Sequence, residues 1–241
     1  MKIIEKIVSK SNDIWSEEIP AIAFLGDSIT QGCFEFYLDK DKSVETVFDE
    51  RYSYHNRLKD IFRLLFPNVP INMINAGISG SSAYGSLSRL QRDVLRFSPD
   101  LTVVSFGLND SGAGIEKIDV YKNSLREIFN KLKQHGSEVI YLTENMMNTE
   151  RSCHIRNAKM QELAEEYMKT QNSGILDAYF DAGKEIAEEC GVHVCDVYGK
   201  WKMLSEAGVN TTNLLANYLN HPIREMHNLT AIMLADLLFK E

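Results

Sequence analysis

The feature that most constrains the fold is a regular alternation of strand-like apolar runs with longer segments of helical periodicity. Buried parallel strands read as short apolar runs rich in β-branched and aromatic residues, and amphipathic helices repeat their apolar residues every three or four positions. Strands that alternate with helices predict a parallel sheet covered on both faces. We expect strands at 20–26, 70–76, 101–107, 138–144 and 192–197, and helices at 53–66, 117–134, 154–170, 175–190 and 225–239.

Length and charge narrow the class of protein. The chain has 241 residues, of which 44% are hydrophobic, and this is enough for the core of one α/β domain spanning 1–241. No repeat, linker or low-complexity tract interrupts it. The formal net charge is -8 and no stretch is rich in Lys or Arg, so neither nucleic acid nor an anionic membrane is an expected partner.

The N-terminus and the cysteines favour a cytoplasmic protein. Met1 to Ile4 is followed at once by Glu5 and Lys6, without the apolar segment of a signal peptide, and no apolar run approaches the roughly 18 residues of a membrane span. The cysteines form no CxxC pair and show no zinc-ligand spacing, so we expect reduced thiols. They are Cys33, Cys153, Cys190 and Cys195.

The segment 21–30 carries the first candidate for chemistry. A buried strand ends abruptly at Gly26-Asp27-Ser28. In open α/β sheets, ligands bind outside the carboxyl ends of the strands, so Ser28 is expected where chemistry usually occurs. A serine in this position is either a helix cap or a nucleophile.

Three further motifs follow in order. The second predicted strand ends near Gly77, whose N–H is a candidate oxyanion donor, and the third ends near Asn109, whose side-chain amide is another. His221 stands before Pro222, which holds it in a loop ahead of the last helix, and it is a candidate general base for Ser28. Each motif alone is more often a cap, a turn or a structural residue; their arrangement at one sheet edge favours acyl transfer.

These motifs resemble the four sequence blocks of the SGNH (GDSL-type) hydrolases. The matching blocks are Gly26-Asp27-Ser28-Ile29-Thr30, Asn75-Ala76-Gly77-Ile78-Ser79-Gly80, Gly107-Leu108-Asn109-Asp110 and His221-Pro222. The resemblance covers about residues 20 to 238 in the family's order. The chain has no Gly-x-Ser-x-Gly motif, so the α/β-hydrolase design lacks its main signature.

The resemblance implies a fold and a set of roles. The fold is a three-layer α/β/α sandwich with a five-stranded parallel sheet, and the reaction is ester hydrolysis through an acyl-serine. Ser28 is then the nucleophile and His221 the base. The oxyanion hole consists of the Ser28 N–H, the Gly77 N–H and the Asn109 side chain. His227 is expected to be a packed helix residue, because the family's base is the histidine followed by proline.

One position departs from the family. An Asp three residues before the histidine usually orients it, and here that residue is Tyr218. Three alternatives follow: a backbone carbonyl holds the imidazole Nδ1–H and leaves a Ser-His dyad, a distant carboxylate takes the place of the Asp, or the enzyme is weakened. Asp196 and Glu144 lie near strand ends and are candidates. The simpler interpretation of Asp196 is a structural role. The simpler interpretation of Glu144 is a solvated carboxylate or a substrate contact.

The segment 33–52 is acidic and aromatic and follows the Gly-Asp-Ser turn. We expect it to be a solvated loop over the same sheet edge, with a substrate-facing lid as the alternative.

The predicted function is hydrolysis of short acyl esters, which needs no metal or organic cofactor. The substrate is a small-molecule or glycan ester; acetyl groups on a carbohydrate are one candidate, and lipids and thioesters are others. No long apolar lid is visible, which disfavours long-chain lipids. Two alternatives remain, an acyltransferase of the same mechanism and a degenerate module that binds an ester or glycan without turnover. The sequence does not indicate an oligomeric state.

Overall fold

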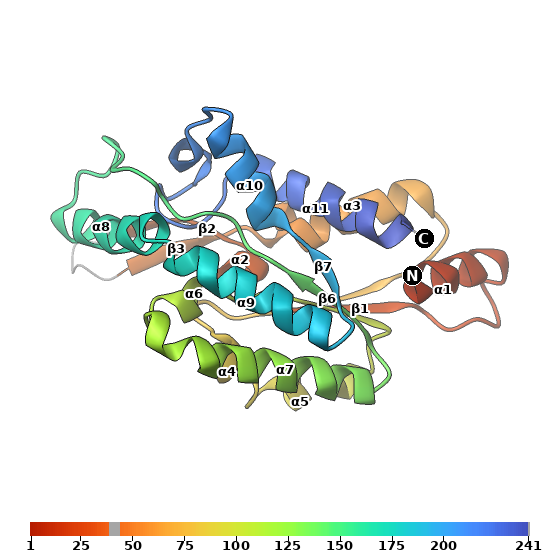
Figure 1. Ribbon diagram of the computed structural model, residues 1–241. Coiled ribbons are helices and arrows are strands. Elements are labelled where there is room, and N and C mark those ends of the chain that lie inside the picture. Colours follow the sequence, from red (N-terminus) through yellow and green to blue (C-terminus); the bar gives the residue numbers. More distant parts are fainter. Residues whose placement is uncertain (39–43, 241) are drawn as a thin grey trace.

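The chain is described by a computed structural model that covers residues 1–38 and 44–240. Its centre is a five-stranded parallel sheet in the order β4-β1-β5-β6-β7 (Figure 1). The strands are β1 (Ala21–Gly26), β4 (Asn72–Gly77), β5 (Leu101–Val104), β6 (Glu138–Leu142) and β7 (His193–Cys195). The predicted number of strands and their parallel pairing are therefore confirmed.

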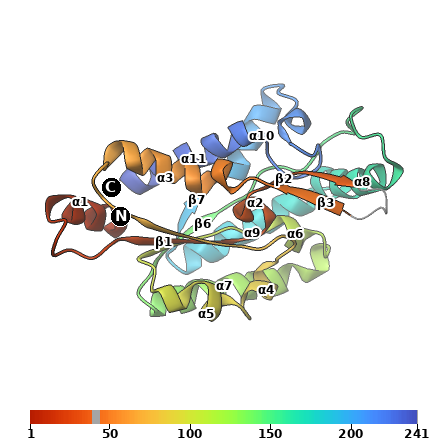
Figure 2. The same cartoon turned by 180° about the vertical axis from the view of Figure 1, so that it is seen from behind.

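Helices cover both faces of this sheet, as Figures 1 and 2 show from opposite sides. One layer contains α3 (Tyr54–Leu65), α10 (Val197–Glu206) and α11 (Arg224–Phe239), and the other contains α4 (Ala83–Ser86), α5 (Leu90–Asp93), α7 (Ile118–Gln134) and α9 (Ile175–Glu189). The three-layer α/β/α sandwich is confirmed. The remaining α-helices are α1 (Lys2–Asn12), α2 (Ser28–Gln31), α6 (Leu108–Ser111) and α8 (Ala158–Asn172), and the 3-10 turns are Glu50–Tyr52, Leu95–Phe97, Ile115–Lys117 and Thr211–Leu214.

Burial explains why these segments fold as they do. Every residue of β1 and β5 is buried, because both strands lie inside the sheet with helices above and below. In α7 the predicted apolar stripe faces the sheet and the acidic and basic residues face water. The buried residues of that stripe are Tyr121, Leu125, Ile128, Phe129 and Leu132.

The segment 33–52 differs from the expectation of a solvated loop. It forms an antiparallel hairpin of β2 (Cys33–Leu38) and β3 (Val44–Phe48), separate from the main sheet. The reason is the content of aromatic and β-branched residues in both strands, CFEFYL and VETVF, which favours extended structure. Two acidic residues of this segment, Asp39 and Asp41, lie outside the described residues.

Some helices also differ from the sequence-based prediction. The helices α1 and α10 were not expected. The helix α8 starts at Ala158 and not at 154, because the side chain of Asn157 caps it by accepting the N–H groups of Lys159 and Met160.

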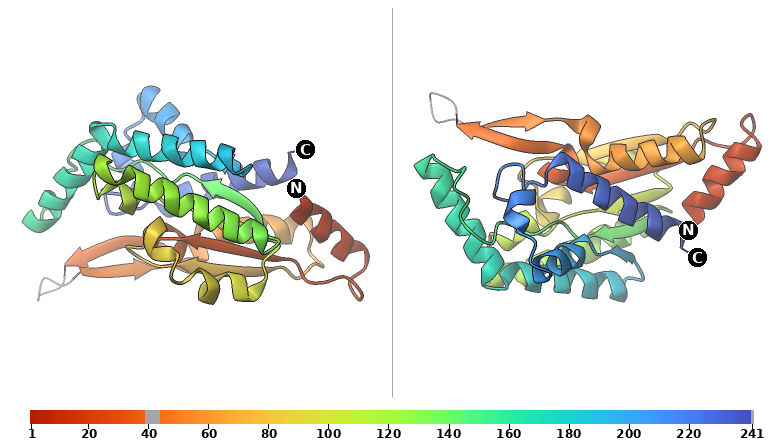
Figure 3. Two further views of the ribbon diagram at one scale, coloured as in Figure 1. Left: turned by 60° about the horizontal axis from the view of Figure 1, so that its bottom comes forward. Right: turned by 90° about the horizontal axis from the view of Figure 1, so that it is seen from above.

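The carboxyl ends of the strands, the hairpin and α8 all lie at one end of the molecule, opposite α1 and the two termini (Figures 1 and 3). The four cysteines are free. None of the helices in the described part of the chain has the length and apolar character needed to cross a membrane.

Candidate active site

The turn after β1 places Ser28 at the carboxyl edge of the sheet. Asp27 caps the short helix α2, and its Oδ1 accepts the N–H of Ile29 at 2.9 Å. Ser28 is the first residue of that helix and is 7% exposed. The cap is therefore Asp27, which leaves the Ser28 hydroxyl available for another partner.

That partner is His221. Its Nε2 lies 3.0 Å from Ser28 Oγ, and its Nδ1 lies 2.9 Å from the carbonyl oxygen of Phe34 in β2. A carbonyl only accepts hydrogen bonds, so Nδ1 carries the proton and Nε2 is free to accept the proton of the Ser28 hydroxyl. The backbone carbonyl thus fixes the tautomer that a general base needs.

A network of asparagines holds the histidine loop. The side-chain oxygen of Asn217 accepts three backbone N–H groups, those of Leu219, Asn220 and His221, each at 3.0 Å. Asn145, which follows β6, donates to the carbonyl of Asn220 at 2.8 Å. Since these groups are buried, the network fixes the backbone that presents the imidazole.

Arg224 at the start of α11 anchors the hairpin that carries the Phe34 carbonyl. It donates to both carboxylate oxygens of Glu35, at 2.7 and 3.1 Å, and to Asp49 at 2.9 Å. Its guanidinium also lies 4.3 Å from the ring centre of Phe34. One side chain therefore ties β2 and the residue directly after β3 to the helix that follows the histidine loop.

The imidazole is a weak base in this environment. Burial lowers the pKa of His221 to about 4, and the Phe34 carbonyl and the charge of Glu35 oppose that shift only in part. The neutral form, which accepts a proton, is therefore the dominant one from mildly acidic pH upward.

Neither Tyr218 nor Asp196 contacts this imidazole. The backbone of Tyr218 is left-handed, with φ 57°, and its ring stacks on His154 at 5.0 Å between centres. Asp196 caps α10 and accepts hydrogen bonds from Thr143 Oγ1 and the N–H of Gly199, both at 3.0 Å. These bonds are the structural role expected for Asp196.

Glu144 is buried, so the expectation of a solvated carboxylate is wrong. It is 3% exposed, its Oε2 accepts the N–H of Leu108 at 2.9 Å, and it hydrogen-bonds the carboxyl group of Asp27. Burial, with the charge of Asp27 next, holds the pKa of Glu144 well above its usual range, and burial raises that of Asp27 to about 6. Its Oε1 has no hydrogen-bond partner within the described residues.

Asn109 lies between Asp27 of this carboxyl pair and the side of Ser28 where the oxyanion is expected. Its side-chain amide donates to Asp27 Oδ2 at 2.7 Å and to the carbonyl of Ser81 at 3.1 Å. Both amide hydrogens therefore have acceptors, and Asn109 reaches an oxyanion by sharing or releasing the Ser81 carbonyl.

Gly77, the last residue of β4, and Gly80, in the loop that follows, have different surroundings. The N–H of Gly77 donates to Asn75 Oδ1 at 3.0 Å, and a Cβ there would stand 2.3 Å from the backbone nitrogen of Gln31. Gly80 is exposed, with φ 74°, and its N–H meets no acceptor among residues 1–38 and 44–240. The sequence singled out Gly77, and its oxyanion role stays a prediction; a second glycine in the same block was the signal for Gly80.

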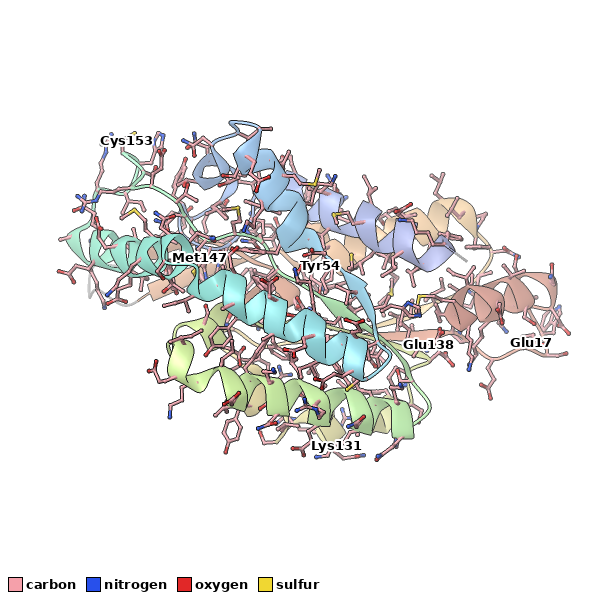
Figure 4. All side chains as sticks on the ribbon, viewed as in Figure 1. Glu17, Tyr54, Lys131, Glu138, Met147 and Cys153 are labelled. Atoms are coloured by element: carbon pink, nitrogen blue, oxygen red, sulfur yellow. The ribbon has the colours of Figure 1, made fainter. Side chains whose placement is uncertain are left out.

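His227 is a packed residue of α11, as predicted. It is 1% exposed, its Nδ1 accepts the N–H of Tyr54 at 3.0 Å, and its ring lies against Phe34. Tyr54 marks this interior position in Figure 4. Among the described residues, no group of three or more His, Cys, Asp or Glu side chains is arranged to hold a metal ion.

Comparisons with known proteins agree with this architecture. The model of the GDSL-like lipase/acylhydrolase family matches residues 24–229. Among solved structures, the acetylxylan esterase Axe2 from Geobacillus stearothermophilus has 19% identity and a TM-score of 0.66, covering 92% of this chain and 95% of its own. A two-domain esterase (CEX) active on acetylated mannans has 18% identity and a TM-score of 0.66, covering 98% of this chain and 52% of its own.

A putative GDSL-like lipase from Parabacteroides merdae has 18% identity and a TM-score of 0.68, covering 91% of this chain and 95% of its own. No curated protein matches the sequence. These structures share the fold, and the family model spans most of the chain together with all four motifs. The chain belongs to the GDSL-like lipase/acylhydrolase family.

Proposed function

We propose that this protein is a serine ester hydrolase that removes short acyl groups, acetyl above all, from carbohydrates. The observation that carries the proposal is the hydrogen bond from Ser28 Oγ to His221 Nε2, with the opposite nitrogen held by the Phe34 carbonyl. A nucleophile, a base in the required tautomer and a group that orients the base are then all present.

The reaction takes two balanced steps. His221 Nε2 accepts the Ser28 proton as Oγ bonds to the ester carbonyl carbon, and the same proton passes to the departing alcohol oxygen as its bond to that carbon breaks. Water then attacks the acyl-serine, gives one proton to Nε2, and releases the carboxylic acid as that proton returns to Ser28. No carboxylate next to His221 is required, because the Phe34 carbonyl orients the ring.

The oxyanion that forms in both steps needs donors. The N–H groups of Ser28 and Gly80 have no acceptor within the described residues and are candidate donors, and Asn109 contributes when it turns from the Ser81 carbonyl. The hydrogen bond from Gly77 to Asn75 weighs against Gly77 as a third backbone donor.

The proposal that the alcohol portion of the substrate is a sugar draws on the structural neighbours of this chain. Two structural neighbours are described as esterases of acetylated xylan or mannan, which supports a glycan ester for this chain. An acyltransferase would use the same first step, with an acceptor alcohol in place of water in the second. Product analysis with and without added alcohol separates the two.

The test is turnover of p-nitrophenyl acetate and of acetylated xylooligosaccharides by purified variants. Ser28→Ala and His221→Ala are expected to lower kcat on the order of 10⁴-fold or more. Ser16→Ala, at an exposed serine beside α1, is the matched control. Full activity of folded Ser28→Ala on both substrates would overturn the proposal, and a folded wild-type protein inactive on both would favour the binding module.

A further inference from the structure

A cavity of about 380 Å³ opens beside the histidine loop, and the catalytic roles proposed above do not use it. It lies between the hairpin, the loop that leads to α8 and the turn that precedes His221. Figure 4 places Cys153 on the outer side of that loop. The residues that matter to its chemistry are Phe36, His154, Arg156, Met160 and Tyr218.

The position of the cavity relative to the dyad indicates which part of a substrate it meets. Phe36, in its wall, packs edge-on against the ring of His221 with ring centres 5.9 Å apart. Asn109 and the loop after β4, the expected oxyanion side, do not line it. Because Nε2 hands its proton to the departing alcohol, the alcohol portion of an ester leaves on the imidazole side. The cavity therefore lies on the alcohol side of the dyad, with Phe36 between it and the imidazole.

The lining combines aromatic faces with polar groups. Tyr218 and His154 stack with an interplanar angle of 21° and form one aromatic wall, and Met160 adds apolar surface. Arg156 supplies hydrogen-bond donors at the exposed rim. A pyranoside presents C–H groups on its faces and hydroxyls around its edge, which suits aromatic walls with a polar rim.

The backbone of Tyr218 is an independent sign of function. A non-glycine residue at φ 57° costs roughly 1 kcal/mol, and such residues cluster at ligand sites. The hydrogen bonds of Asn217 to the following residues stabilise this turn. The turn thus points the residue at the family's usual Asp position toward the cavity and away from the imidazole.

We propose that this cavity is the subsite for the sugar of a glycan ester, with Tyr218 as its stacking platform. The inference rests on the proposed ester hydrolysis for its purpose, and it names the part of the substrate that this chain recognises. Its occupant is a pyranoside of an acylated oligosaccharide.

Binding is measured apart from catalysis. Ser28→Ala protein is titrated calorimetrically with unacetylated xylotetraose, and the dissociation constant is compared with that of Ser28→Ala/Tyr218→Ala and Ser28→Ala/His154→Ala. We expect each second substitution to weaken binding at least tenfold. Trp15→Ala in the same background, at an aromatic residue beside α1 that is 93% exposed, is the matched control and should leave binding unchanged. In the described part of the chain His154 stacks on Tyr218 and contacts neither Ser28 nor His221, so its variant remains informative when Tyr218→Ala disturbs the His221 loop.

A kinetic arm distinguishes the sugar from the acyl chain. The ratio of kcat/KM for acetylated xylooligosaccharides to that for p-nitrophenyl acetate is expected to fall at least tenfold in Tyr218→Ala and in His154→Ala. A fall in kcat/KM for p-nitrophenyl butyrate relative to that for p-nitrophenyl acetate, with the glycan ratio unchanged, would overturn the proposal and make the cavity an acyl site. Absence of xylotetraose binding by an enzyme that cleaves p-nitrophenyl acetate would refute the subsite alone. Binding without any ester cleavage would refute the proposed function and keep the subsite.

Discussion

Replacing Glu144 with glutamine tests the buried carboxyl pair beneath Ser28. Burial, with the charge of Asp27 next, holds the pKa of Glu144 well above its usual range in the folded protein, whereas the unfolded chain releases that proton above about pH 4.3. Glutamine keeps an oxygen for Leu108 and donates its amide to Asp27 without titrating. The variant thus keeps the hydrogen bonds and loses the proton linkage.

The raised pKa of Glu144 in the folded protein sets the direction in which stability changes with pH. The folded state binds one more proton than the unfolded state, so its stability is greatest at low pH and falls as pH rises toward the folded pKa. The slope approaches about 1.4 kcal/mol per pH unit wherever Glu144 is protonated in the folded chain and ionised in the unfolded chain. Asp110, whose pKa burial raises to about 7, titrates in both proteins. Asp27 is coupled to Glu144, so the difference between the two proteins reports the titration of the carboxyl pair.

The assay is urea unfolding of wild type and Glu144→Gln at pH 5, 6 and 7. Across this range the wild-type protein loses stability through the titration of Glu144 and the variant does not. The stability of the variant relative to wild type is therefore expected to rise with pH. Glu162→Gln, at an exposed glutamate of α8, is the matched control and should stay parallel to wild type. A constant difference between wild type and Glu144→Gln would mean that Glu144 is ionised in the folded protein and would refute the reasoning.

Three further predictions concern the base, its support and the close approach of α2 to β4. Because burial lowers the pKa of His221 to about 4, the acid limb of kcat/KM should fall near pH 4, and a limb near pH 6.5 would contradict the buried neutral base. The lowered pKa also links His221 to stability. Its contribution to the free energy of unfolding is fully present above pH 6.5 and is lost as pH falls toward 4. Arg224→Ala should lower kcat about tenfold on p-nitrophenyl acetate, because the hairpin that presents the Phe34 carbonyl loosens; partial rescue by Arg224→Lys is expected, and unchanged kcat in the alanine variant would argue against this support. Gly77→Ala should cost about 3 kcal/mol in urea unfolding, since its Cβ would meet the backbone nitrogen of Gln31 at 2.3 Å, and a loss below about 0.5 kcal/mol would show that the backbones move apart.

The sequence allowed prediction of those site residues that act through their own side chains. Ser28 and His221 follow strand-end and loop signals, and the structure brings them together. The strands were readable because buried parallel strands are apolar throughout, as in β1 and β5. The hairpin also carried a signal, the aromatic and β-branched residues of its two strands, but the acidity of the segment favoured a loop.

The orienting group of His221 could be anticipated only as an alternative. A backbone carbonyl leaves no trace in residue type, so nothing in the sequence identifies Phe34. The contact between Asp27 and Glu144 was equally hidden, because it depends on two strand ends meeting in the folded sheet. Local patterns predict elements and single reactive groups, whereas pairings across the sheet require the tertiary fold.

The central claim is that Ser28 is activated by His221 with a backbone carbonyl, and no carboxylate, behind the imidazole. Its most direct test is the rate at which a fluorophosphonate labels the protein, with the modified residue located by mass spectrometry. The account predicts stoichiometric labelling of Ser28 in wild type, the same rate in Asp196→Asn, and loss of labelling in folded His221→Ala. Failure of the folded wild-type protein to label at Ser28, or a loss on the order of 10³-fold or more in Asp196→Asn, would contradict it.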